Sequence, residues 1–408
     1  MFKSKKFVVL NLTVLLILSA CNSGGSSSNT NNKPTNNVAV PVTPPSNPNL
    51  TINISPNGPG TSSLCSNINI PCVTVKVCNP NNTSSCATIK NVLIDSGSSG
   101  LSVFSNVLGS VSLPNATTSG GGNLVQCILY ADGTANWGPV AYANITLNSE
   151  STTESIPMQI INAIYPGAAN CSSNPMATPS DLGFNGILGV SPFTQTSGYY
   201  SCNSTSCTLI NSPTITTQNP IRYLSHGYES GVTFKLPALG NNGATEAVGY
   251  AIFGVGSNSD NTPPTNDNVN YYQIATGTQQ YMHMSSTLQS VSAIKYGFLD
   301  TGSNGIYFND SSINFDSYGF YTPNSTINFI ANNTNYPAGS PISTSFNMAN
   351  FDNLINNTNN SAFNNIGGLF GDNNSYLDYG LPFFFGKTVY ICFTGMTCNG
   401  TPGPYWAF

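Results

Sequence analysis

Two stretches of this sequence repeat one pattern: "NVLIDSGSSGLSVF" from Asn91 to Phe104, and "KYGFLDTGSNGIYF" from Lys295 to Phe308. Each places an acid, Asp95 or Asp300, directly after two large apolar residues and before a turn of hydroxyl, Gly and Ser. Four of the six positions that begin at each acid are identical, and the acids are 205 positions apart. The pattern indicates an internal duplication in which each half of the chain supplies one carboxylate.

The length of the chain favours two lobes. It has 408 residues, which is more than one hydrophobic core usually holds. We therefore expect an N-terminal β lobe over residues 61–215 and a C-terminal β lobe over residues 216–408, in a monomer. Only 6% of the residues are charged, with 10 Lys and Arg against 15 Asp and Glu. No basic run follows the N-terminus, so no nucleic-acid partner is expected.

The pattern after residue 60 is that of an all-β protein. Short runs rich in Val, Ile, Tyr and Phe are separated by clusters of Gly, Asn, Ser and Pro. No long stretch has a helical period, and strands do not alternate with helices, so a parallel α/β sheet is not expected. The runs include "CVTVKVC" (72–78), "QCILYADG" (126–133), "VAYANITL" (140–147), "GVTFKLPAL" (231–239) and "KTVYICF" (387–393).

The N-terminus has the features of an export signal. Three lysines precede the apolar run "FVVLNLTVLLIL", which is too short to span a bilayer, so residues 1–20 are expected to be a signal peptide. The run ends in "LSAC", which resembles the lipobox of bacterial lipoproteins and implies a lipid on Cys21. Because Asn22 is not Asp, the resemblance favours anchorage to the outer membrane. Residues 21–60, rich in Ser, Asn and Pro, are expected to be a disordered tether.

Cysteine usage agrees with an exported protein. Of 11 cysteines, ten remain after Cys21, an even number that suits a disulfide framework. Cys202–Cys207 and Cys392–Cys398 are close enough to be local bridges, whereas the other pairings stay open. With two histidines in the chain and no C-x-x-C motif, neither a metal site nor a cofactor is expected.

The duplicated turn resembles that of the pepsin-like aspartic peptidases. In that family an apolar pair followed by D-[ST]-G-[ST] occurs once per lobe, and the two turns meet in a cleft. The resemblance implies a bilobal, all-β fold of two related barrel-like lobes, with Asp95 and Asp300 as the catalytic acids. It also implies that the flanking turn residues brace the loops and orient the acids; these are Ser96, Gly97, Ser98, Thr301, Gly302 and Ser303.

Further stretches fit the same resemblance. The segment 126–147 is similar to the family's flap hairpin, with Tyr130 at the flap-tyrosine position and Asp132, Gly133 and Thr134 at its tip. "FNGILGV" (184–190) is similar to the segment that supports the first catalytic loop, and Gly380 would mark its C-terminal counterpart. The signal segment, the turns and "GLPFFFGKTVY" together also resemble an uncharacterised family of bacterial exported lipoproteins.

Two functions stay open at this point. The first is a membrane-anchored aspartic endopeptidase that hydrolyses an extended peptide or protein by activating a water between two aspartates. The second is a lipoprotein on the same fold that binds peptide or glycan without catalysis, since a fold does not determine a function. The intact pair of acids favours the first.

The lipobox resemblance predicts that Cys21 carries the membrane anchor. Mass spectrometry of the mature protein should find a diacylglyceryl-modified N-terminus at Cys21. A Cys21→Ser variant should be released from membranes in soluble form, because it lacks the thiol that accepts the lipid. A variant that stayed with the membrane fraction would contradict this assignment.

Overall fold

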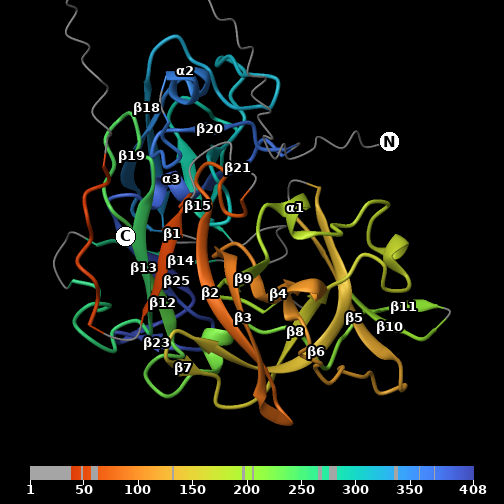
Figure 1. Ribbon diagram of the computed structural model, residues 1–408. Helices are drawn as coiled ribbons and strands as arrows, with labels where there is room; N and C mark the ends of the chain where they lie inside the picture. The colour runs from red at the N-terminus through yellow and green to blue at the C-terminus, as the bar shows by residue number, and fades with distance from the viewer. Residues whose placement is uncertain are drawn as a thin grey trace, which may run out of the picture.

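The computed structural model describes residues 38–46, 49–56, 63–130, 133–194, 198–204, 206–264, 269–274, 283–334, 339–357, 359–371 and 373–408. Over these ranges the protein consists mainly of β-strands with a few short helices, which confirms the expected all-β class (Figure 1). The elements of the N-terminal half are β1 (Asn49–Ile54), β2 (Pro71–Asn79), β3 (Asn82–Asp95), β4 (Ser99–Phe104), η1 (Ser105–Leu108), β5 (Asn123–Leu129), β6 (Ala135–Leu147), β7 (Glu150–Ser151), β8 (Ile156–Ile161), η2 (Ala168–Asn170), α1 (Pro179–Leu182), β9 (Gly186–Val190), β10 (Tyr199–Cys202) and β11 (Cys207–Ile210).

The C-terminal half continues the same style of short strands and tight turns. Its elements are η3 (Pro220–Tyr223), β12 (Gly231–Lys235), β13 (Ala247–Phe253), β14 (Tyr271–Gln273), β15 (Met284–Leu288), β16 (Tyr296–Leu299), β17 (Ile306–Tyr307), β18 (Ile327–Thr334), β19 (Ile342–Met348), α2 (Phe351–Asn357), β20 (Gly367–Gly368), β21 (Tyr376–Tyr379), α3 (Leu381–Phe384), β22 (Thr388–Cys392), β23 (Thr397–Cys398), β24 (Thr401–Pro402) and β25 (Tyr405–Ala407).

Alternating side chains explain why these segments form strands. In β2, Val73, Val75 and Val77 are buried, whereas Thr74 and Lys76 between them are exposed. A period of two places every second side chain on the same face of a sheet, and β-branched residues pack well on a pleated surface. Each of the five runs singled out in the sequence overlaps a strand; these strands are β2, β5, β6, β12 and β22.

The strands form one large sheet, one smaller sheet and a two-stranded sheet of β23 and β24. The large sheet has 16 strands in the order β11-β10-β5-β6-β8-β4-β9-β3-β2-β1-β13-β12-β22-β25-β14, with β7 beside β6. The smaller sheet has seven strands, all from the C-terminal half, in the order β19-β18-β15-β16-β21-β17-β20. In Figure 1 the strands β2 to β6 and β8 to β11 lie at the centre and right, and most of the C-terminal half lies on the left and above.

The first strand corrects the expected tether over residues 21–60. β1 pairs with β13 along its whole length, so a strand from the start of the chain lies against the C-terminal half. Before it, Val40 N–H donates to the carbonyl of Ala238 at 3.1 Å, and Ser46 Oγ donates to Asp260 at 2.6 Å. The alternating apolar residues of "NLTINI" are the signal for this strand, and Leu50, Ile52 and Ile54 are buried. Residues 1–37 lie outside the described part of the chain.

Each half contains the same arrangement of four strands. In the first, β9 lies parallel to β3 and antiparallel to β4, and β4 lies parallel to β8. In the second, β21 lies parallel to β16 and antiparallel to β17, and β17 lies parallel to β20. β3 and β16 are the strands that precede the two acidic turns. The repetition seen in the sequence is therefore also a repetition of topology.

Five disulfide bonds join all ten cysteines after Cys21. Cys202–Cys207 and Cys392–Cys398 form the two local bridges expected from their spacing. The three pairings that the sequence left open are Cys65–Cys72, Cys78–Cys86 and Cys127–Cys171. Only Cys127–Cys171 closes a long loop, with a sequence separation of 44, and it attaches β5 to the segment after β8.

Loop size predicts different contributions of these bonds to stability. A Cys127→Ser/Cys171→Ser variant should lose about 4 kcal/mol in the free energy of unfolding, because its bond closes the longest loop and so restricts the unfolded chain most. The matched control, Cys202→Ser/Cys207→Ser, opens a loop of separation 5 and should lose about 2 kcal/mol. Urea denaturation measures both, and equal losses would contradict the loop-size explanation.

Candidate active site

The two acidic turns lie at equivalent ends of the repeated strand arrangement. β3 ends at Asp95, whose parallel partner in β9 is Gly189. β16 ends at Leu299, whose parallel partner in β21 is Tyr379. The N–H of Asp300 then donates to the carbonyl of Tyr379 at 3.1 Å. Each acid thus lies where a buried strand ends and a turn begins.

Two hydroxyl groups join the two acidic turns to each other through hydrogen bonds. The N–H of Ser96 donates to Thr301 Oγ1 at 3.0 Å, and the N–H of Thr301 donates to Ser96 Oγ at 2.9 Å. Each hydroxyl donates its own proton to the opposite strand, Ser96 to the carbonyl of Leu299 at 3.2 Å and Thr301 to that of Ile94 at 2.8 Å. Ser96 and Thr301 are 1% and 0% exposed, so water does not compete for these four bonds.

Each carboxyl group is held in the same way by its own turn. Asp95 Oδ1 accepts the N–H of Gly97 at 2.7 Å, and its Oδ2 accepts the hydroxyl of Ser98. Asp300 repeats this arrangement with Gly302 N–H at 2.8 Å and the Ser303 hydroxyl at 2.8 Å. Both acids therefore have one backbone donor and one hydroxyl donor.

The cross-bracing brings the carboxyl groups of Asp95 and Asp300 into direct contact. A hydrogen bond with Asp95 is among the causes that raise the pKa of Asp300, and such a bond requires a proton on one of the two acids because an ionised carboxylate can only accept. The two glycines make room for this approach. A Cβ on Gly97 would lie 2.7 Å from Asp300 Cγ, and one on Gly302 would lie 2.7 Å from Asp95 Oδ1. No side chain could be accommodated at either position without displacing a carboxyl group.

The surroundings favour the neutral form of Asp300. Desolvation by the surrounding protein raises its pKa well above the usual range, and the charge of Asp95 and the hydrogen bond with it raise the pKa further. The hydrogen bonds from Ser303 and Gly302 act in the opposite direction but are the smaller effects. Asp95 is 6% exposed, whereas Asp300 is partly exposed. The two acids can therefore share one proton, and the partly exposed Asp300 is accessible to solvent.

A third acid, Asp378 in β21, lies beside this pair and was not singled out in the sequence. Its side chain is 3% exposed. Burial raises the pKa of Asp378 well above the usual range, and the charge of Asp300 raises it further. The sequence does contain a signal that could have identified Asp378. It is an acid inside the apolar run "YLDYG", where a buried position is expected.

The segment similar to a flap forms a β-hairpin. β5 and β6 pair from Val125 opposite Pro139 to Leu129 opposite Ala135. At the tip, Tyr130 N–H donates to the carbonyl of Thr134 at 3.0 Å. The N–H of Gly133 donates back to the carbonyl of Tyr130 at 3.0 Å. Asp132 lies outside the described residues.

The side chain of Tyr130 turns towards the strand that carries the first acid. Its ring packs against an apolar cluster that includes Leu93 and Ile187, and Leu93 is two residues before Asp95. Its hydroxyl accepts a hydrogen bond from Asn136 Nδ2 at 3.0 Å. The structure thus brings Tyr130 near the base of the Asp95 turn.

The outer edge of the hairpin is covered rather than free. β10 pairs with β5 from Tyr199 opposite Gln126 to Cys202 opposite Asn123, and β11 pairs with β10. The Cys127–Cys171 bond ties β5 to the segment after β8, and the fully buried Trp137 of β6 donates its ring N–H to the carbonyl of Tyr165 at 3.1 Å. The base of the hairpin is therefore held in place by the framework.

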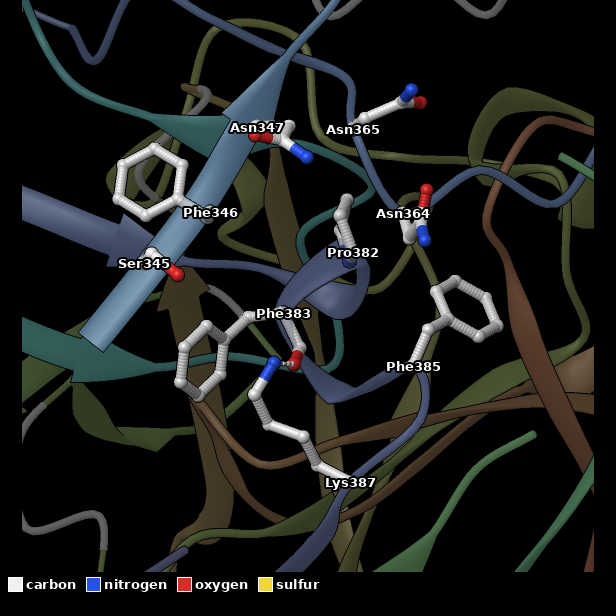
Figure 2. A pocket seen from close by; sticks show the side chains of 9 residues that line it. All are labelled: Ser345, Phe346, Asn347, Asn364, Asn365, Pro382, Phe383, Phe385 and Lys387. Carbon is white, nitrogen blue, oxygen red and sulfur yellow. Dashed lines mark hydrogen bonds between the residues drawn. The ribbon is translucent and has the colours of Figure 1, made fainter. Parts of the chain in front are cut away.

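A separate small cavity of about 140 Å³ lies in the C-terminal half, between β19 and the region of α3. Figure 2 shows the side chain of Lys387 reaching back to the carbonyl of Phe383, to which Nζ donates at 2.7 Å. Burial lowers the pKa of Lys387 to about 8. Neither acidic turn contributes a residue to the cavity lining, so the cavity is distinct from the Asp95–Asp300 pair.

Two further observations bear on ligands and location. Within the described ranges, no group of three or more His, Cys, Asp or Glu side chains is gathered closely enough to hold a metal ion. None of the helices in the part of the chain that the structure describes has the length and apolar character of a membrane span. Cys21 and the signal segment lie outside those ranges.

Residues 46–408 match the family described as "Protein of unknown function (DUF3443)". The chain belongs to this family. The DUF3443 match begins just before β1 and includes both acidic turns, the hairpin and Asp378. It therefore agrees with β1 as part of the folded domain rather than of a tether. No curated protein matches the chain.

The raised pKa of Asp300 predicts the pH dependence of stability. Its folded-state pKa lies above the value of about 3.9 for an unfolded aspartate. The stability that neutral Asp300 contributes is therefore complete at low pH and is lost as pH rises through the folded-state pKa. An Asp300→Asn variant cannot ionise, so its melting temperature relative to wild type should rise from about zero near pH 3 to a clear gain at neutral pH.

Asp260 offers a control of opposite sign. Hydrogen bonds from the Ser46 side chain and backbone lower the pKa of Asp260. Its contribution to stability is therefore present above the unfolded pKa and is lost as pH falls. An Asp260→Asn variant should be less stable than wild type at neutral pH and equal to it at low pH. Thermal melts from acid to neutral pH compare the two, and a parallel trend for both variants would contradict the assignment for Asp300.

Proposed function

We propose that this protein is an aspartic endopeptidase that hydrolyses peptide bonds on a pepsin-like bilobal fold. The observation that carries the proposal is the contact between the carboxyl groups of Asp95 and Asp300. They come from two copies of one turn, each held by a backbone N–H and a hydroxyl. A structural ion pair would bring opposite charges together, whereas this site brings like charges together at a cost in stability.

The chemistry follows from one proton shared by two acids. The ionised carboxylate acts as the general base and takes a proton from a water molecule as that water attacks the scissile carbonyl carbon. The protonated carboxyl donates a hydrogen bond to the carbonyl oxygen, where negative charge develops. The proton that the base took from water passes to the amine nitrogen as the C–N bond breaks, which returns the pair to its singly protonated state, and no covalent intermediate forms. The donors in the two turns keep both carboxyl groups in position throughout.

The hairpin is proposed to cover the substrate. Its Tyr130 lies against the cluster at the base of the Asp95 turn, and β6 continues from the tip into the large sheet. An extended peptide bound between this hairpin and the acids would be shielded from bulk water, which strengthens each electrostatic interaction in the site. Tyr130, Asp132, Gly133 and Thr134 are proposed as the residues that contact it.

The proposed location is the bacterial envelope, with a lipid on Cys21 as the anchor to the outer membrane. Five disulfide bonds support an oxidising compartment. Only 6% of the residues are charged, so solubility depends on neutral polar side chains.

The alternative function is that of a lipoprotein that binds peptide or glycan at the same place without cleaving it. The covered, immobilised base of the hairpin favours this alternative, since a fixed hairpin suits a binding groove.

Substitution of either acid tests the two functions against each other. Asp95→Asn and Asp300→Asn should each abolish peptidase activity, because an amide can neither serve as the base nor hold the shared proton. The double variant should be little worse than either single variant, because the two acids act as a unit. Cleavage of a denatured protein is measured from roughly pH 3 to 7, where a carboxyl pair can be singly protonated, with and without pepstatin.

The control for folding is the melting temperature of each variant, which should not fall because Asn is nearly isosteric with Asp. Activity that survives either substitution would contradict the mechanism. A folded wild type that cleaves no substrate in this range but retains a bound peptide or glycan would establish the binding function instead.

A further inference from the structure

A loop near the start of the folded chain reaches the second acidic turn. The loop spans residues 65–72, is closed by the Cys65–Cys72 bond and ends in the first residues of β2. Within it, Asn69 is 0% exposed and has a φ of 55°, in the left-handed region. Asn adopts this backbone conformation more readily than most residues. Because its side chain is buried, each of its polar groups needs a partner.

The carboxamide of Asn69 has its partners in the C-terminal half. Its Nδ2 donates to the carbonyl of Asn304 at 2.9 Å and to that of Phe363 at 2.8 Å. Its Oδ1 accepts the N–H of Phe363 at 2.8 Å. Both N–H groups and the oxygen of the side chain are therefore used. The amide joins two backbone segments of the C-terminal half, and one of them is the turn that carries the second acid.

The two ends of the loop are fixed to the N-terminal half. Cys72 pairs with Leu93 of β3, and the N–H of Cys65 donates to the carbonyl of Gly183 at 2.8 Å. Both cysteines belong to the apolar cluster in which Leu93 lies and against which Tyr130 packs. The ends of the loop are thus attached to the strand that leads to the first acid.

The middle of the loop is fixed to the C-terminal half. The backbone N–H of Asn69 donates to the carbonyl of Ser361 at 2.9 Å. Its neighbour Ile68 packs against an apolar cluster that includes Phe351 and Phe363. Together with the bonds of the carboxamide, these contacts hold the loop from both halves. It therefore links the frameworks of the two acids.

The two acidic turns are supported alike at the serine that donates to each acid. The N–H of Ser191 donates to the carbonyl of Ser98, and the N–H of Leu381 donates to the carbonyl of Ser303, both at 2.8 Å. Ser191 directly follows β9, and Leu381 comes shortly after β21, the corresponding strand of the repeat. At this serine each turn is held by its own half of the chain.

At the next residue of the turn the support differs. Ser99 is the first residue of β4 and lies opposite Val190 in the ladder with β9. Asn304, which aligns with Ser99 in the repeat, lies before β17, which begins at Ile306. A residue outside the ladder needs another partner for its backbone groups. For the carbonyl of Asn304, the side chain of Asn69 is that partner.

We propose that Asn69 is a positioning residue for the Asp300 turn, which it holds from the opposite half of the chain through the carbonyl of Asn304. That carbonyl directly follows Ser303, whose hydroxyl donates to Asp300 Oδ2 at 2.8 Å. A turn fixed on both sides keeps this hydroxyl and the Gly302 N–H directed at the acid. The consequence for catalysis rests on the proposed peptidase function, whereas the hold on the turn does not.

The hold on the turn is tested without an activity assay. Asn69→Gly removes the carboxamide but keeps the backbone conformation, because glycine adopts a positive φ without strain. The released turn should present its two donors less well to Asp300. Since those hydrogen bonds favour the ionised form, the pKa of Asp300 should rise by about one pH unit. NMR of the full chain with carbon-13-labelled aspartate follows the titration, and the signal lost in Asp300→Asn identifies Asp300.

A second variant and a matched control separate this hold from stability. Ser303→Ala should move the Asp300 midpoint in the same direction, and the double variant Asn69→Gly/Ser303→Ala should move it by less than the sum of the two shifts, because both remove one donor. Asn148→Gly should leave the midpoint unchanged, since Asn148 also has a φ of 55° but lies in the turn after β6.

The outcome that overturns the proposal is a folded Asn69→Gly protein with a lower melting temperature and the wild-type midpoint for Asp300, because Asn69 would then be purely structural. Shifts that add fully in the double variant would overturn it as well. If Asn69→Gly does not fold, Asn69→Ser, which also lacks the carboxamide, is measured in its place.

Kinetics then test the positioning role. Asn69→Gly should lower kcat about tenfold with little change in KM, because Asn69 acts through the turn and not on the substrate. In a Ser303→Ala background the same substitution should have a smaller effect. A raised KM with an unchanged kcat would overturn the positioning role. A wild type with no activity would refute the peptidase function and leave the NMR result to decide the role of Asn69 in the turn.

Discussion

Reciprocal hydrogen bonding between Ser96 and Thr301 is the constraint on which the site depends. Two acids with the same charge do not come together unless other interactions hold them, and the hydroxyl and N–H groups of these residues supply four buried hydrogen bonds. A typical intramolecular hydrogen bond contributes about 1 kcal/mol, so the set is of the right order to offset repulsion that one shared proton has already reduced. Because each bond joins the two halves of the chain, the contact forms only when both halves have folded.

The hairpin illustrates how the framework around the site restricts its motion. β10 adds a strand to the outer side of β5, and the Cys127–Cys171 bond holds β5 from a second direction. Such covalent and sheet contacts lower the freedom of the hairpin base and set the position of Tyr130. Under either proposed function, the ligand would meet a surface that is largely preformed, which reduces the entropy cost of binding.

The repeat is symmetrical in its backbone and asymmetrical in its chemistry. The two halves correspond closely in their strands, glycines and donor hydroxyl groups. However, Ile187 pairs with β3, the strand before the Asp95 turn, whereas Asp378 pairs with β16, the strand before the Asp300 turn. A duplicated site in which both acids had identical surroundings would divide the shared proton evenly. Their surroundings are not identical, since Asp378 is buried beside Asp300 alone.

The sequence by itself determined the all-β class, the strands and the two acidic turns, because strand periodicity and turn residues are local signals. It also indicated Cys202–Cys207 and Cys392–Cys398, whose spacing is short. The sequence analysis placed the start of the fold too late, because the partner of β1 is β13, about 200 residues further along the chain. The Cys127–Cys171 bond, the contact between the two carboxyl groups and the place of Asp378 were decided by tertiary structure. Each of them depends on which strands become neighbours, and that is settled by burial over the whole chain rather than by the residues next to it.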